Sequence, residues 1–174
     1  MKKLTADALR QYHETGVYAP VRALSTEEAT TLRRRLEAHE ASQGVIAGTL
    51  RHKTHLVFTW LNDLIRHPGI LDAVEDIIGP NILCWGTSFF IKEPRNPSYV
   101  SWHQDSTYWG LEPADIVTAW VALSESTLAN GAMRSRCLIV GKISPISPRR
   151  YAASASAGRT QRPSCTSAAS TSAT

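Results

Sequence analysis

The chain has 174 residues, of which 43% are hydrophobic and 20% are charged, as expected for a globular protein with one domain and a core. No apolar run approaches the roughly 20 residues of a membrane helix, and the first residues lack the apolar segment of a secretion signal. The three cysteines have neither a disulfide pattern nor zinc spacing. We therefore expect a cytoplasmic protein with no membrane partner.

The formal net charge of +4 is distributed unevenly along the chain. Residues 135–174 contain six of the lysines and arginines and none of the acidic residues, so the preceding part is slightly acidic. The basic balance is therefore poor evidence for a nucleic-acid surface on the folded part, and we expect no nucleic-acid partner. Binding of nucleic acid through the basic tail is the weakest alternative.

Four helices are predicted in the first half of the chain. The helical spacing of apolar residues places them at residues 4–16, 25–42, 60–67 and 68–79. Gly16 ends the first helix, and Ser25 with Glu28 forms a capping box at the start of the second. Pro68 suits the first turn of the last helix, which ends at Gly79.

Strands are predicted in the second half of the chain. Runs rich in β-branched and aromatic residues cover residues 81–93, 99–105 and 116–125, and a further strand begins at Ala132. The Asn130-Gly131 pair between the last two is a hairpin signal. Helices followed by antiparallel strands indicate an α+β fold, or a β-sandwich with helical decoration.

The pattern ends near Arg134. Residues 135–174 form a basic tail rich in Ser, Ala and Thr, without acidic residues, and from about residue 152 we expect disorder because the tail cannot bury enough apolar surface. The predicted domain organisation is thus residues 1–134 as the folded part and residues 135–174 as the tail. About four strands are predicted, whereas a jelly roll needs roughly eight, so the fold is expected to be incomplete at its C-terminal end.

His103 and Asp105 lie two residues apart on a predicted strand, beside Trp102 and shortly before Tyr108 and Trp109. Residues i and i+2 of a strand point to the same side, so the two side chains can converge on one point. An imidazole nitrogen and a carboxylate oxygen suit divalent iron, and a second histidine would complete a facial triad with three open positions. A bare His-x-Asp is more often a hydrogen-bonded pair or two surface residues.

The segment "CWGTSFFIKEPRNPSYVSWHQDSTYWGLEPADIVTAWVALSESTLANGAMR" resembles the phytanoyl-CoA dioxygenase family of Fe(II)/2-oxoglutarate oxygenases. The upstream "HETGVYAPVRALSTEEATTLRRRLE" and "HPGILDAVEDIIGPNIL" resemble the N-terminal helices of that family, so the resemblance covers roughly residues 5–134. It implies N-terminal helices packed on a double-stranded β-helix, the cupin-type jelly roll.

The resemblance also implies roles for four residues. His103 and Asp105 would be two of the three iron ligands, Trp120 would line the 2-oxoglutarate pocket, and His55 would face the co-substrate. Core packing is an equal alternative for Trp120, and a loop histidine with a backbone partner is the alternative for His55. A carboxylate at position 105 favours oxygenation over halogenation, because family halogenases have a small residue there.

The family's third ligand is a histidine that follows the His-x-Asp motif, and an arginine beyond it binds 2-oxoglutarate. No histidine follows His103 in this sequence, and the arginines of the tail lie outside the family pattern. The interpretation is a frameshift, chimera or truncation near residue 134, which would impair activity. Resemblance thus implies a dioxygenase that uses Fe(II), 2-oxoglutarate and O₂ to hydroxylate a small organic substrate. The alternative is a non-catalytic cupin-like binding or interaction fragment.

Overall fold

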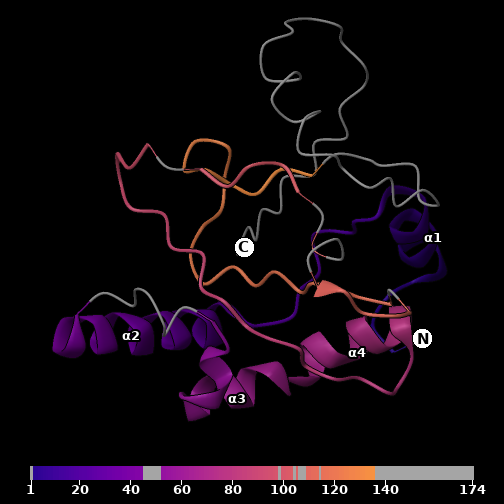
Figure 1. Ribbon diagram of the computed structural model, residues 1–174, viewed down its shortest axis with the longest axis horizontal. Coiled ribbons are helices and arrows are strands. Elements are labelled where there is room, and N and C mark those ends of the chain that lie inside the picture. The colour runs from indigo at the N-terminus through magenta and orange to yellow at the C-terminus, as the bar shows by residue number, and fades with distance from the viewer. Residues whose placement is uncertain are drawn as a thin grey trace, which may run out of the picture.

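The computed structural model describes residues 2–44, 52–97, 99–103, 105, 109–113 and 115–135. Within them the helices are α1 (Ala6–Thr15), α2 (Thr26–Gln43), the short 3₁₀ helix η2 (Thr54–Leu56), α3 (Thr59–Ile65) and α4 (Pro68–Ile78) (Figure 1). The four predicted helices are confirmed, each to within a few residues of its expected bounds. None of the described helices is both long and apolar enough to cross a membrane.

The ends of these helices are fixed by local caps. The Thr5 hydroxyl accepts a hydrogen bond from the Ala8 N–H at the start of α1, and Gly16, with φ of +76°, ends that helix in the left-handed conformation. The predicted capping box at α2 is present, with Glu28 N–H donating to the Ser25 hydroxyl and Ser25 N–H donating to the Glu28 carboxylate. Local sequence therefore suffices to set these helix boundaries.

The N-terminal residues are tied to α4 by one carboxylate. Asp76 accepts hydrogen bonds from the backbone N–H groups of Lys2, Lys3 and Leu4 at 2.7–2.8 Å. The Lys2 ammonium adds an ion pair of 2.7 Å with Glu75. Hydrogen bonds from Leu4 and its neighbours lower the pKa of Asp76 to about 2, because they stabilise the ionised carboxylate.

The prediction of a double-stranded β-helix is wrong. The described part of residues 81–135 contains no strand, and its pairing with the rest of the chain is one isolated antiparallel bridge between His52 and Ser88. A helix makes its hydrogen bonds within one segment, whereas a strand needs a second segment beside it. The strand predictions relied on β-branched and aromatic residues. Such residues show that a segment suits a sheet, but they do not supply the second segment that it must pair with.

The predicted Asn-Gly turn is present without its hairpin. Gly131 has φ of +89°, and Ala132 N–H donates to the Thr127 carbonyl across the turn. The Asn130 side chain supports the turn, since it accepts from Thr127 N–H and donates to the Glu125 carbonyl. No strand pairing follows within the described residues, so the turn alone does not create a hairpin here.

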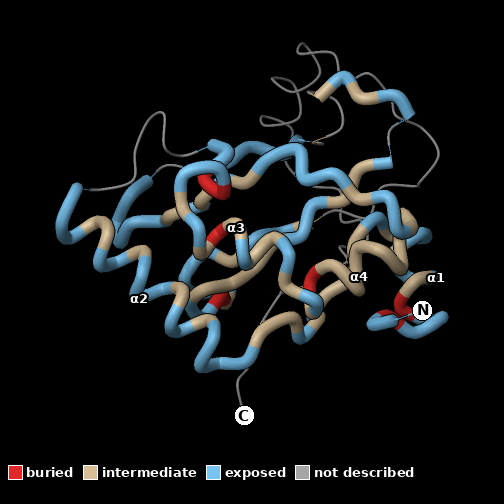
Figure 2. Tube along the Cα trace, turned by 90° about the horizontal axis from the view of Figure 1, so that it is seen from below, coloured by how far each residue is buried: buried red, intermediate tan, exposed pale blue. Residues whose placement is uncertain are grey.

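The buried part of the described chain is small. Its buried apolar residues are Leu4, Ala8, Leu61 and Ile70. Figure 2 shows the buried positions as short separate stretches rather than as one continuous core. An aromatic row adds contacts between distant segments, because the ring of Phe58 packs on His39 of α2 at 4.8 Å and on Trp60 of α3 at 5.9 Å. Trp60 in turn packs on Phe89 at 6.1 Å.

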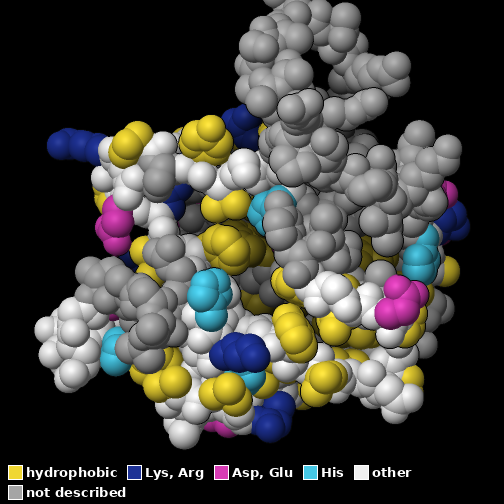
Figure 3. Space-filling view, in the orientation of Figure 1, with side chains coloured by type: hydrophobic (Ala, Val, Ile, Leu, Met, Phe, Trp, Pro, Cys, Tyr) yellow, Lys and Arg dark blue, Asp and Glu magenta, His cyan; other side chains and the backbone are white. Residues whose placement is uncertain are grey.

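Large apolar side chains are exposed along the chain that follows α4. The most exposed of them between residues 81 and 103 are Leu83, Phe90, Tyr99 and Val100, with exposed fractions of 63–84%. Figure 3 shows hydrophobic side chains at several places on the surface that faces the viewer. The sequence pattern predicted that these side chains form a buried sheet face. Among the described residues, no layer covers them.

Residues 136–174, with the expected disordered stretch from about residue 152, lie outside the described residues. The division into residues 1–134 and 135–174 stays a prediction.

Candidate functional site

His103 and Asp105 lie in direct contact. The distance from His103 Nε2 to Asp105 Oδ1 is 3.2 Å, and each side chain is 36% exposed. Two ligands of a divalent ion, each about 2.1 Å from it and at right angles to one another, are about 3.0 Å apart. The spacing fits a shared metal ion, and it equally fits a hydrogen bond between a protonated imidazole and a carboxylate. The metal role of both residues therefore stays a prediction.

The His103 ring is held by a backbone carbonyl. Nδ1 lies 2.8 Å from the Ser101 oxygen, and a carbonyl oxygen only accepts, so Nδ1 carries a proton. Nε2 is then the ring nitrogen that can donate its electron pair to a metal, as in metal-binding histidines whose other nitrogen donates to a carbonyl. The arrangement leaves Nε2 directed to the side of the ring where the Asp105 carboxylate lies.

The Asp105 carboxylate is held by a residue 13 positions later in the chain. The Thr118 hydroxyl donates to Asp105 Oδ2 at 2.7 Å, while Oδ1 faces His103. Thr118 was not among the predicted site residues. One sequence feature could have identified it: Thr118 is the one hydroxyl residue within the apolar run "IVTAWVAL" that follows the motif. Ser101 acts through its backbone, so its side chain gave no signal.

The family resemblance implies a third protein ligand for iron. Among the described residues, no group of three or more His, Cys, Asp or Glu side chains could hold a metal ion. The donors present are of the right kind for divalent iron, since imidazole and carboxylate both bind it. Two protein donors are thus available in the described part of the chain.

His55 occupies a different place from the His103–Asp105 pair. It is 7% exposed in η2, and Thr87 Oγ1 accepts from its backbone N–H at 3.2 Å and lies 2.9 Å from its Nδ1. It lines a hollow of about 310 Å³ whose other walls are Leu56, Val57, Thr59, Asn62 and Asp63. His103, Asp105 and Trp120 are not among these walls. The predicted role of His55 toward the co-substrate stays a prediction.

Trp120 lies two residues after Thr118 and is half-buried. Core packing and a place beside a ligand are both compatible with this burial, so the predicted role of Trp120 stays a prediction. Of the four predicted site residues, the structure thus brings two into contact. It adds Thr118, which connects the His-x-Asp motif to the segment that carries Trp120.

Comparison with known proteins gives matches over the same part of the chain. The sequence pattern of the family described as "Phytanoyl-CoA dioxygenase (PhyH)" matches residues 4–135. A "Probable phytanoyl-CoA dioxygenase" of Caenorhabditis elegans is 36% identical over 87 residues, which are 46% of this chain and 26% of the relative. A "Probable alpha-ketoglutarate-dependent hypophosphite dioxygenase" of Stutzerimonas stutzeri is 32% identical over 79 residues, 45% of this chain and 27% of the relative.

The matched part of the chain spans about a quarter of the length of these two curated relatives. No solved structure matches the chain significantly. The family match nevertheless covers most of the 174 residues and includes the His-x-Asp motif together with the helices that precede it. The chain belongs to the phytanoyl-CoA dioxygenase family.

Proposed function

We propose that this protein is part of a 2-oxoglutarate-dependent dioxygenase that hydroxylates a small organic substrate. The observation that carries the proposal is the contact of 3.2 Å between His103 Nε2 and Asp105 Oδ1 in a chain of this family. A relative whose name states dependence on alpha-ketoglutarate supports the choice of co-substrate. The substrate of a relative is not carried over, because one family serves many substrates.

In this proposal His103 Nε2 and Asp105 Oδ1 hold Fe(II). When bound, iron together with 2-oxoglutarate and O₂ supplies the oxidation that converts a C–H bond into a C–OH group. Ser101 fixes the His103 ring through Nδ1, and Thr118 fixes the carboxylate through Oδ2, so both donor atoms are oriented before a metal arrives. Such prior orientation lowers the ordering cost of binding.

Trp120 and His55 are proposed to face 2-oxoglutarate, on the strength of the family resemblance. For Trp120 the support is its position two residues after Thr118, which touches Asp105. For His55 the support is a buried imidazole beside a hollow, with its ring held through Nδ1 by Thr87. Substitution of either residue by Ala should raise the concentration of 2-oxoglutarate needed for half-maximal turnover.

The test is the formation of succinate from 2-oxoglutarate with Fe(II), ascorbate and O₂. Because the described residues provide two protein donors, we expect the 174-residue chain alone to form little succinate. A version joined to the C-terminal half of a complete family member should form it, and His103→Ala or Asp105→Ala in that version should abolish turnover. Unchanged turnover in both variants would contradict the proposal. A joined protein without turnover would favour the alternative, a non-catalytic binding or interaction fragment.

A further inference from the structure

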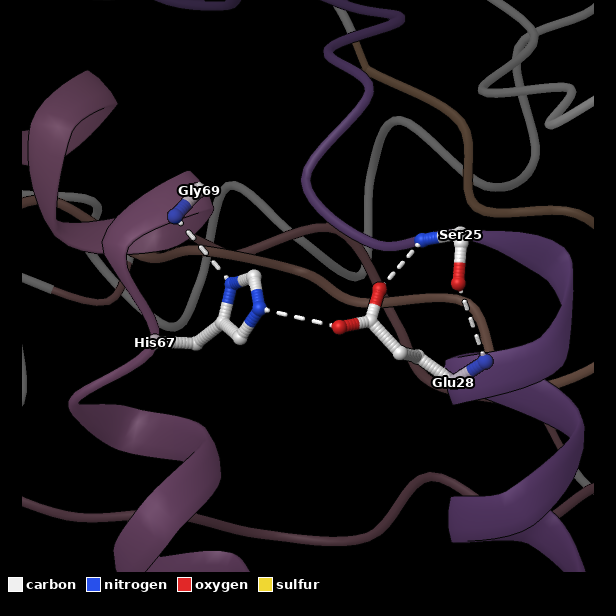
Figure 4. Close-up of polar contacts among 4 residues, drawn as sticks. All are labelled: Ser25, Glu28, His67 and Gly69. Atoms are coloured by element: carbon white, nitrogen blue, oxygen red, sulfur yellow. Dashed lines mark hydrogen bonds and ion pairs between the residues drawn. The ribbon is translucent and has the colours of Figure 1, made fainter.

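The first turns of α2 and α4 are joined through one histidine (Figure 4). His67 Nδ1 accepts a hydrogen bond of 3.1 Å from the Gly69 N–H at the start of α4. On the other side of the ring, His67 Nε2 lies 3.4 Å from Glu28 Oε1. The other Glu28 oxygen accepts from Ser25 N–H at 2.7 Å, so the ring is connected directly to the capping box of α2.

These contacts fix where the proton of the ring lies. A backbone N–H only donates, so His67 Nδ1 must present its electron pair to Gly69 and carries no proton. The single proton of the neutral ring is then on Nε2, where it is directed to the Glu28 carboxylate. The neutral form of His67 with its proton on Nε2 therefore serves both helices at once.

A second proton on the ring would break the cap of α4. Protonated Nδ1 cannot accept from Gly69, and a positive charge at the first turn of α4 is opposed by the helix dipole. The Glu28 carboxylate favours the charge, and a hydrogen bond from Ser25 N–H lowers the pKa of Glu28, so Glu28 stays ionised while a histidine titrates. That attraction is weak because Glu28 is 50% exposed and its oxygen lies 3.4 Å from Nε2.

Charged groups of the neighbouring segments make contacts of their own. Arg66 is the neighbour of His67 in the chain, and its guanidinium donates to the Asn62 carbonyl. From the segment before α2, Arg22 lines a separate hollow with Leu4 and Tyr18. The acidic residues of α4 interact with the N-terminal residues of the chain through charge or hydrogen bonds. These acidic residues are Asp72, Glu75 and Asp76. Glu28 is therefore the charged group that contacts His67 among these residues.

The start of α4 lies close to the segment before α2. A methyl group placed on Gly69 would clash with the Ala23 carbonyl oxygen and would lie 3.1 Å from His67 Nδ1. Release of the Gly69 N–H from its cap would therefore act at a point of close packing.

We propose that His67 is a proton-sensitive joint between α2 and α4. The neutral ring caps α4 and binds Glu28, and protonation releases the first turn of α4 while the contact with α2 is kept. The joint contributes to stability while the ring is neutral, and this contribution is lost when Nδ1 gains a proton. Because α4 leads directly into the segment that carries His103, its first turn is a place where pH can act on that segment.

Thermal unfolding followed by helix circular dichroism at pH 7.5 and pH 5.5 tests the joint in the full chain. In His67→Asn, the Asn side chain can still accept from Gly69 N–H but does not titrate in this range. We expect the fall in Tm between the two pH values to be about 2–4 °C smaller in His67→Asn than in the unmodified chain. The control His13→Asn removes an exposed histidine from the last turn of α1, where the helix dipole favours a protonated ring, so it should not make the fall smaller.

The same fall in Tm for the unmodified chain and for His67→Asn would overturn the proposal. Should His67→Asn fail to fold, two NMR measurements on the unmodified chain decide the question. At pH 8 the ring proton of His67 should be on Nε2, and a proton on Nδ1 would refute the joint. From pH 7.5 to 5.5, exchange of the Gly69 amide, corrected for its intrinsic rate, should rise roughly fivefold, and an unchanged rate would refute it as well.

Discussion

At the scale of single residues, the contacts around His103 and Asp105 are made by two neighbours of different kinds. Ser101 holds the His103 ring through a backbone carbonyl, and Thr118 holds the Asp105 carboxylate through a hydroxyl. In metal sites, loss of a group that orients a ligand in this way typically lowers metal affinity about 10–100-fold. If Asp105 binds iron as proposed, Thr118 is the residue at which orientation of the carboxylate can be separated from metal binding itself.

Thr118→Val should weaken Fe(II) binding about tenfold, because the Val side chain keeps the shape of Thr but cannot donate to Asp105 Oδ2. Thr118→Ser keeps the hydroxyl and should bind Fe(II) as the unmodified chain does. Anaerobic calorimetric titration with Fe(II) compares the three proteins. Equal affinity of Thr118→Val and Thr118→Ser would show that the hydroxyl does not orient a metal ligand.

Gly69 is required because of a close approach between two backbones. A Cβ at this position would lie 2.1 Å from the Ala23 carbonyl oxygen, so Gly69→Ala must displace the segment before α2. We expect Gly69→Ala to lower the free energy of unfolding by about 1–3 kcal/mol. The matched control is Gly86→Ala, whose Cβ would meet Lys53 Cγ at an ordinary 3.9 Å and should change stability little. Urea unfolding of both variants measures the difference, and equal stability would refute the close approach.

At the scale of elements, helices were predictable and strands were not. Ser25 with Glu28, Pro68 and Gly79 act within one or two turns, so the sequence alone locates the ends of α2 and α4. Residues 81–93 satisfy the composition of a strand, but their hydrogen-bond partners would have to come from elsewhere in the chain. The bridge from His52 to Ser88 is the pairing that the described residues provide.

The joining of the chain start to α4 gives a prediction with a definite pH range. The pKa of Asp76 is lowered to about 2, chiefly by the hydrogen bond from Leu4 N–H, so its stabilising effect is complete above the ordinary aspartate value of about 3.9. Asp76→Asn should therefore lower Tm at pH 7. The difference from the unmodified chain should shrink as the pH falls from about 4 to about 2, where the native carboxylate becomes protonated.

The control for Asp76 is Asp72→Asn on the same helix. Asp72 acts on Lys2 only through its charge, so this substitution should change Tm much less than Asp76→Asn at pH 7. Melting curves at pH 7, 4, 3 and 2 provide the comparison. A Tm loss in Asp76→Asn that is the same at every pH would mean that the ionised form of Asp76 does not hold the N-terminus.

At the scale of the whole molecule, the described chain combines a small core with exposed apolar residues after α4. The contact between His103 and Asp105 was expected from a spacing of two residues on a strand, yet Asp105 lies in a turn, so the contact is present without the strand that predicted it. Thr118 escaped prediction because its contact with Asp105 spans 13 positions and depends on the path of the chain between them. Contacts of that kind are set by tertiary structure, which a local pattern does not contain.

The central claim is that His103 and Asp105 hold iron, and the most direct measurement is anaerobic Fe(II) binding to the full chain. We predict that His103→Ala and Asp105→Ala each weaken Fe(II) binding by at least about tenfold. His52→Ala removes another exposed histidine, one that contacts Ser88, and should leave binding unchanged. Affinity that is the same in all three variants and in the unmodified chain, or no binding by the unmodified chain at millimolar Fe(II), would contradict the claim.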